Sequence, residues 1–169
     1  MPTRDQPNFN SDRNIIDQFL IPEPFADIIV EINELSKSFS MLQYLHSTEA
    51  SFLVLSQLSS VLQRLFQMNP VLDLENDLSF HLTESCRYAA ALHVLFPLMA
   101  YFPDPTLLVG ALVHRLKFSL ASLLPLMGPS NQFLLWLLAV GAISAEQMPE
   151  RQWFEGHLAL IASGLSIIV

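Results

Sequence analysis

The sequence predicts an all-α fold of about six helices that pack as stacked antiparallel pairs. Apolar residues recur at the three-to-four spacing of a helix over most of the chain. Short stretches that contain proline or glycine separate these segments and can form turns. No segment convincingly alternates apolar and polar residues as a half-buried strand does. These three observations favour helices stacked on helices.

The chain of 169 residues has the length of one domain. Two independent domains are therefore disfavoured. Residues 1–22 are rich in Asn, Asp and Pro and show no sustained period. We expect a disordered lead at 1–22, followed by a single helical domain at 23–169.

The first two expected helices have one apolar stripe each, as the outer helices of a bundle do. The first begins at Pro24, because proline suits the first helical position, where its missing N–H would be unpaired. Ser47 or Thr48 caps the second, and Asn69-Pro70 stops it. The stripes are Phe25, Ile28, Ile29, Ile32, Leu35, Phe39 and Leu42 in the first helix and Phe52, Leu55, Leu58, Val61, Leu62, Leu65 and Phe66 in the second.

The third expected helix, at residues 78–101, has hardly any polar side. Its small alanines, Ala89–Ala91, permit close approach of a neighbouring helix, so we expect it inside the domain. Pro97 removes one backbone hydrogen bond and should kink or end this helix.

The fourth expected helix spans 106–127, with Asp104 as its cap and Pro105 at its first position. Gly128-Pro129 should stop it. Its leucines lie along one side, while His114, Arg115 and Lys117 supply polar positions.

Two more helices complete the expected fold. Ser130 or Asn131 caps a segment, Phe133–Ala145, that is almost wholly apolar and is expected to be the central helix. Met148-Pro149 restarts the chain, and the last helix runs to about Ile167.

The composition indicates that some apolar surface lacks a cover within this chain. Hydrophobic residues make up 51% and charged residues 14%, against roughly 25% charged in soluble domains. A protein partner or a missing part of the chain explains this best, whereas a merely rich core and a membrane surface are the alternatives. We expect a protein partner or self-association.

The charge pattern disfavours direct binding to nucleic acid. The net charge is −8, with twelve acidic and four basic side chains in Met1–Ser85. Only Arg115 and Lys117 lie close together, whereas phosphate binding needs clustered cations. The longest strongly apolar runs, 133–145 and 158–169, are shorter than the ~20 residues that span a bilayer, so no transmembrane segment is expected.

No catalytic signature is present, and we expect a protein that is not an enzyme and has no cofactor or metal. His81 and Glu84 could share a metal, but two ligands are too few for a site. Cys86 lies beside Arg87, which would favour a thiolate, yet a small buried residue is the better interpretation. A lone cysteine also forms no disulfide within the chain.

Six residues stand out as structural or interaction anchors. Proteins use Trp and Arg often at binding hot spots, whereas burial and local ion pairs are the ordinary explanation. The candidates are Arg87, Trp136, Glu150, Arg151, Trp153 and Phe154.

Two segments carry a resemblance to a known family. Residues 134–145 read LLWLLAVGAISA and precede Pro149-Glu150-Arg151 and Trp153-Phe154, while residues 84–90 read ESCRYAA. They resemble the fungal-specific regulatory domain found behind the zinc cluster in many fungal transcription factors, with Tyr88 where leucine is more typical. The resemblance covers about residues 78–160.

The resemblance implies an all-helical effector domain that contacts other proteins in the nucleus, with the cytoplasm as the alternative location. The six-cysteine zinc cluster of the family is missing, because Cys86 stands alone. Its DNA binding therefore does not carry over, and 23–169 is either a whole effector domain or part of a larger regulatory domain. The alternative function is a helical pocket that binds or transforms an apolar metabolite, with Arg87, His93 or Glu146 as its polar groups.

Overall fold

The computed structural model describes residues 25–68, 77–101, 103–128 and 132–166. Over these ranges the chain forms six α-helices and two short 3-10 segments, without a strand. The elements are α2 (Phe25–Tyr44), α3 (Thr48–Gln67), α4 (Asp77–Leu98), η1 (Met99–Tyr101), α5 (Thr106–Leu123), η2 (Leu124–Leu126), α6 (Gln132–Ser144) and α7 (Arg151–Ser166). The prediction of an all-α fold is confirmed.

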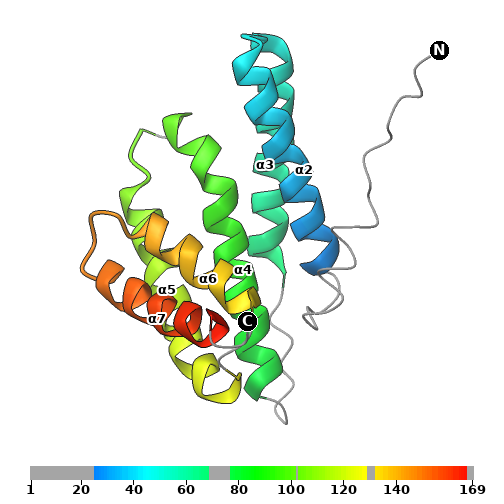
Figure 1. Cartoon of the computed structure of the whole chain (residues 1–169). Helices are drawn as coiled ribbons and strands as arrows, with labels where there is room; N and C mark the ends of the chain where they lie inside the picture. The colour runs from blue at the N-terminus through cyan, green and yellow to red at the C-terminus, as the bar shows by residue number, and fades with distance from the viewer. Residues whose placement is uncertain (1–24, 69–76, 102, 129–131, 167–169) are drawn as a thin grey trace, which may run out of the picture.

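The helices pack as three consecutive pairs, α2 with α3, α4 with α5, and α6 with α7 (Figure 1). This confirms the predicted stacked pairing. The expected lead at 1–22, Pro24 as the helix start, the Asn69-Pro70 stop, Pro129 and the caps at Ser130 or Asn131 lie outside the described residues.

The central helix is α4. It contacts α2, α3, α5 and α6, and its residues Cys86, Ala89 and Ala91 are completely buried. The prediction that Phe133–Ala145 is central is wrong, because α6 packs mainly on α7, α4 and α5 among the described residues, and Ile143 near its end is exposed. Small alanines, rather than the highest hydropathy, mark the helix that neighbours can approach from several sides.

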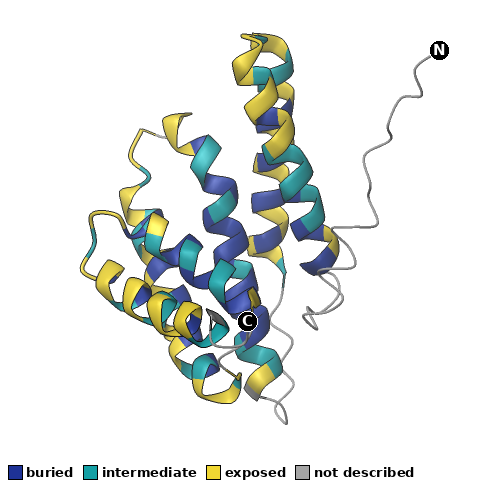
Figure 2. Ribbon diagram, viewed as in Figure 1, coloured by how far each residue is buried: buried dark blue, intermediate teal, exposed yellow. Residues whose placement is uncertain are grey.

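The α2–α3 hairpin packs on α4 at its base and projects beyond the other helices at its turn (Figure 1). Buried apolar residues occur in α2 up to Phe39 and in α3 from Val54 onward. No residue from Met41 to Leu53 is buried, and this end of the hairpin is exposed in Figure 2. The prediction that Phe52 and Phe66 belong to the buried stripe is wrong, since they are 62% and 47% exposed.

Proline and capping residues determine the ends of α4 and α5. The α-helix of α4 ends one residue after Pro97 and continues as η1, as the missing N–H requires. The Asp104 carboxylate accepts a hydrogen bond from the Thr106 N–H at 3.1 Å. Helix α5 ends at Leu123 instead of 127, because Pro125 cannot donate within a helix and leaves only the tighter η2 turn.

The segment Thr106–Leu126 is long and apolar enough to cross a bilayer by length and composition. One side of it packs against α4 and the core, where Leu112, Val113 and Leu116 are buried. Arg115 and Lys117 lie at its middle, and charges at the centre of a bilayer are costly. One face of the segment therefore packs in the core, and 39% of its most apolar 18-residue window is buried.

Helices α6 and α7 pack most closely where Phe154 meets Gly141. Phe154 is completely buried, and a Cβ atom added at Gly141 would overlap its ring. The chain turns between the two helices through backbone hydrogen bonds from Met148 N–H to Ala145 O and from Arg151 N–H to Met148 O, at 2.9 and 3.2 Å.

Candidate functional site

The candidate site is the free end of the α2–α3 hairpin, which we call the apolar tip. Its large apolar side chains are 62–85% exposed. They come from the last turns of α2 and the first turns of α3. The tip residues are Met41, Tyr44, Leu45, Phe52 and Leu53.

Helical geometry places these side chains away from the core. Met41 and Tyr44 are three residues apart on α2, and Leu45, which follows α2, donates its N–H to the Met41 carbonyl oxygen at 3.0 Å, so the three lie on one side. Phe39 and the preceding core residues lie on a different face, against α3 and α4. The turn that joins the helices places His46 at a φ of 54°, a left-handed conformation that histidine adopts more readily than most residues.

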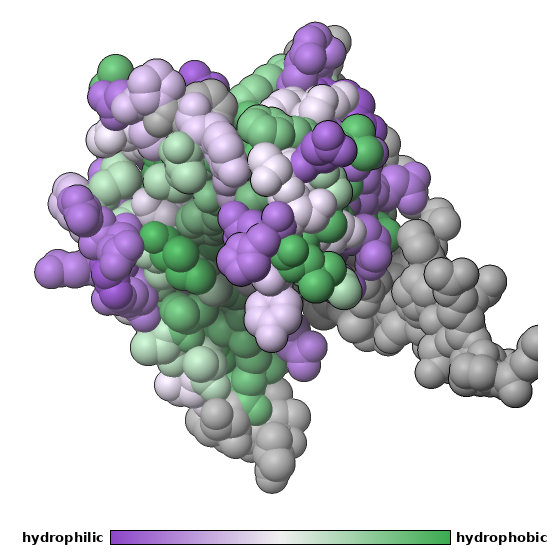
Figure 3. Space-filling view, turned by 90° about the horizontal axis from the view of Figure 1, so that it is seen from above, coloured by the Kyte–Doolittle hydropathy of each residue, from purple (hydrophilic) through white to green (hydrophobic). Residues whose placement is uncertain are grey.

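The apolar tip lies in a nearly uncharged region. Between Ser38 and Gln63 the sequence has no Lys or Arg and a single acidic residue, Glu49. Viewed from above in Figure 3, apolar side chains reach the surface between polar ones. The tip can therefore meet another surface without desolvating an ion pair.

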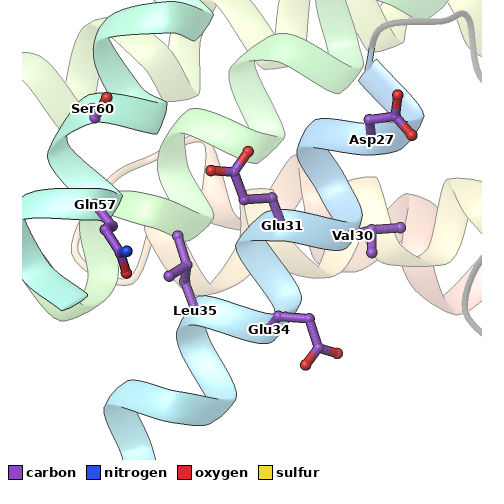
Figure 4. Close-up of a pocket in the computed structure, with 7 residues that line it drawn as sticks. All are labelled: Asp27, Val30, Glu31, Glu34, Leu35, Gln57 and Ser60. Atoms are coloured by element: carbon purple, nitrogen blue, oxygen red, sulfur yellow. The ribbon is translucent and has the colours of Figure 1, made fainter. Parts of the chain in front are cut away.

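An acidic groove lies nearer the base of the hairpin and has a volume of about 510 Å³. Asp27, Glu31 and Glu34 of α2 line it together with residues of α3, and Figure 4 shows Glu31 and Leu35 toward α3. Glu31 binds Arg64 through both carboxylate oxygens at 2.6 Å. Glu34 binds Lys37 at 3.3 Å. These contacts indicate a partly neutralised surface.

The carboxylates of the acidic groove do not form a candidate metal-binding group. The described part of the chain contains no group of three or more His, Cys, Asp or Glu side chains that could hold a metal ion. His81 and Glu84 do not belong to such a group.

Arg87 holds a buried polar cluster together inside the domain. Its guanidinium binds the Glu84 carboxylate and donates to the Met68 carbonyl oxygen at 2.6 Å. The Tyr88 hydroxyl donates to the same carboxylate at 2.6 Å. Burial, and then the hydrogen bond to Glu84, raises the pKa of Tyr88. The cluster connects α4 to the end of α3 and leaves Arg87 little surface for a partner.

Glu150 and Arg151 make local contacts around the start of α7. Glu150 is 8% exposed and binds His114 of α5 at 2.9 Å. Arg151 is exposed and binds Glu155 at 2.6 Å, one turn along the same helix. The first contact ties α7 to α5, and the second lies on the surface of α7.

The aromatic candidates pack against the body of the domain. Phe154 is completely buried, whereas Trp136 and Trp153 are half-buried. Trp136 stacks on Phe133 with ring centroids 5.5 Å apart. Trp153 contacts Phe154 edge to face at 5.1 Å, and Lys117 lies 5.8 Å from its ring centroid. All three are placed as packing residues.

Cys86 is a structural residue on the inner helix. It is completely buried, and burial raises the pKa of its thiol far above its usual range. The thiolate would be the reactive form. The interpretation of Cys86 as a small buried residue is confirmed.

A pocket of about 430 Å³ lies between α4, α5 and the end of α6. Leu92, Phe96 and Val109 form apolar walls, and Glu146 and Thr106 lie at its edge. Three polar groups were expected in a metabolite pocket. Glu146 lines this pocket, whereas Arg87 and His93 do not. The volume is within the range of small-molecule sites.

No family model, curated protein or solved structure matches this chain. The candidate site therefore rests on its own geometry. Sequence reasoning missed Met41, Tyr44, Leu45 and Leu53 as a group, although the absence of charge from Ser38 to Thr48 was a usable signal.

Proposed function

We propose that this chain is a helical interaction domain of a transcription regulator, without a DNA-binding module of its own. The observation that carries the proposal is the apolar tip, five large side chains held in water at the end of a projecting hairpin. Keeping such a group exposed is unfavourable, and on soluble proteins it marks a binding surface. The resemblance to the fungal regulatory domain supplies the transcriptional role and the nuclear location.

The rigid base of the hairpin suits this role. Leu58, Val61 and Leu65 of α3 are completely buried between α2 and α4, so the tip is presented on an ordered support. A contact made by preformed helices loses less conformational entropy than one made by a flexible segment.

A reporter experiment tests the proposal. The whole chain is fused to an unrelated DNA-binding domain in a fungal reporter strain, and transcription is measured. The fusion should change reporter output several-fold relative to the DNA-binding domain alone. The variant L45E/F52E should lose that change, because two carboxylates at the tip prevent an apolar contact.

The matched control is L107E/L160E, which adds two carboxylates at exposed leucines of α5 and α7. It should keep the reporter response. Equal protein levels are checked by immunoblot. A fusion that leaves the reporter at its basal output, or a control that fails as completely as the tip variant, argues against the proposal.

A second candidate function is the binding of an apolar metabolite, favoured by the pocket beside Glu146. Its apolar walls and single carboxylate suit a ligand that has an apolar body and a cationic or hydroxyl group. A thermal-shift screen of such compounds should find a stabilising ligand. Substitution V109W, which fills the pocket, should abolish that shift if this candidate is correct.

A further inference from the structure

We propose that the apolar tip binds the apolar tip of a second copy of this chain, to form a two-fold symmetric dimer. The inference rests on the proposed function, since it names the partner of the same surface. A two-fold contact brings identical patches together, and it is the commonest symmetry of soluble oligomers. The patch must therefore be compatible with itself.

Charge favours the tip as the place where two copies meet. Each chain has a net charge of −8, so most approaches of two copies bring like charges together. From Ser38 to Gln63 the only acidic residue is Glu49. Glu49 lies in the first turn of α3, where the positive end of the helix dipole offsets its charge.

The length of α2 keeps the other carboxylates apart in this arrangement. Glu34, the groove carboxylate nearest the tip in sequence, lies 10 residues before Tyr44, which is about 15 Å along a helix at 1.5 Å per residue. At physiological ionic strength, interactions between exposed charges are screened over about 8 Å. The acidic grooves of two copies joined at their tips therefore repel each other only weakly.

The area of the tip fits a reversible dimer. A large apolar or aromatic side chain offers roughly 150–250 Å², and the five tip residues are 62–85% exposed. The tip thus presents on the order of 700 Å², slightly below the ~800 Å² per partner of a standard stable interface. A dissociation constant between about 1 and 100 µM is expected.

Absence of charge also favours a second copy over a different protein. A basic partner would gain little at the tip, because Glu49 is the single acidic residue from Ser38 to Gln63. Two identical, nearly uncharged tips can bind each other without an oppositely charged partner surface. Raising the salt concentration should strengthen the dimer slightly, because it screens the repulsion of two acidic chains.

Sedimentation velocity over a concentration series tests the dimer. The wild-type chain should shift reversibly from monomer to dimer. L45E/F52E should weaken the association by about 100-fold or more, and L107E/L160E should associate like the wild type. Far-UV circular dichroism and a thermal melt show that each variant is folded.

Site-directed crosslinking identifies the contact independently. Cys86 is the single cysteine of the chain and is completely buried, so a new surface thiol is the reactive one. L45C should form a disulfide-linked dimer under mild oxidation, and L107C should remain monomeric. A wild-type chain that stays monomeric at about 1 mM, or L107C crosslinking as fast as L45C, would overturn the proposal.

These results separate the dimer from the proposed function. A chain that dimerises through the tip but leaves the reporter unchanged supports the dimer and contradicts the transcriptional role. A monomer whose tip variants lose the reporter response contradicts the dimer and leaves a different protein as the partner of the tip.

Discussion

Gly141 is the residue on which the packing of α6 against α7 depends most directly. It allows the Phe154 ring to lie against the α6 backbone, in space that a Cβ would occupy. Substitution G141A should lower the free energy of unfolding by about 1–3 kcal/mol through overpacking. Gly156 of α7 has no atom within 4 Å of an added Cβ, so G156A should raise it by roughly 0.5–1 kcal/mol. Urea unfolding of both variants measures whether their free energies of unfolding change in opposite directions.

Arg87 neutralises a carboxylate that has almost no access to water. Side-chain exposure is 13% for Arg87 and 8% for Glu84. Substitution R87M leaves Glu84 with the Tyr88 hydroxyl alone and should destabilise by about 3–5 kcal/mol, as expected for an unpaired buried charge. Y88F keeps the ion pair and should cost about 1 kcal/mol. Equal losses in the two variants, measured by thermal or chemical denaturation, would show that the ion pair has no special role.

His93 should make stability depend on pH. It lies half-buried beside the rings of Trp136 and Phe96, and burial lowers its pKa from the ordinary 6.5. The unfolded chain then binds a proton at a higher pH than the folded chain, so stability falls as the pH decreases through 6.5. H93Q removes this titration. The melting temperature of the wild type should drop more than that of H93Q between neutral and mildly acidic pH.

At the scale of elements, α3 has no buried residue from Thr48 to Leu53 and a buried face from Val54 onward. Leu58 is completely buried, whereas Leu53, little more than one turn earlier, is 63% exposed. L58A should destabilise the monomer by about 2–5 kcal/mol, and L53A should change it by no more than about 0.5 kcal/mol. Unfolding is measured at a concentration low enough to keep the chain monomeric. A large loss in L53A would mean that the tip is packed within its own chain.

The buried and exposed residues of α3 also show how much of a helix could be predicted from the sequence. Helical periodicity places Leu58 and Leu65 on a buried stripe, and both are buried. It also assigns Phe52 and Phe66 to that stripe, but both lie at helical spacing from the exposed Ser59 and Gln63 and so belong to the outer face of α3. Pro97 indicated the end of α4, whereas Pro125 lay within an expected helix that ends earlier at Leu123. The position of Pro125 and the face of α3 on which each phenylalanine lies account for these differences.

Candidate site residues were harder to predict than elements. Trp and Arg attract attention because partners often bind them, but Arg87 and Phe154 are held by contacts inside the domain. The apolar tip has no Trp or Arg and no motif. Its signal is the low charge content of 14%, which predicted uncovered apolar surface without locating it.

At the scale of the whole molecule, one central helix supports two unlike parts. Helix α4 holds α5 and α6 on one side and the α2–α3 hairpin on the other (Figure 1). The body buries Phe154 completely but exposes Leu107, Phe118 and Leu160 on its surface, whereas the hairpin has five exposed large apolar side chains at its tip. Asp27, Glu31 and Glu34 lie at the base of the hairpin. Near the tip, Glu49 is the single acidic residue from Ser38 to Gln63. The hairpin thus keeps most of its carboxylates away from the apolar tip, the surface that we propose binds a second copy.

Hydrogen exchange at low and high protein concentration tests the central claim, that the apolar tip is the contact surface, most directly. At low concentration, amides of residues 41–53 should exchange faster than those of α3 from Val54 onward, because the tip lacks buried side chains. At high concentration, protection should increase in 41–53 and remain unchanged in α5 and α7. Exchange at 41–53 that is independent of concentration, or new protection confined to the body, would contradict the account.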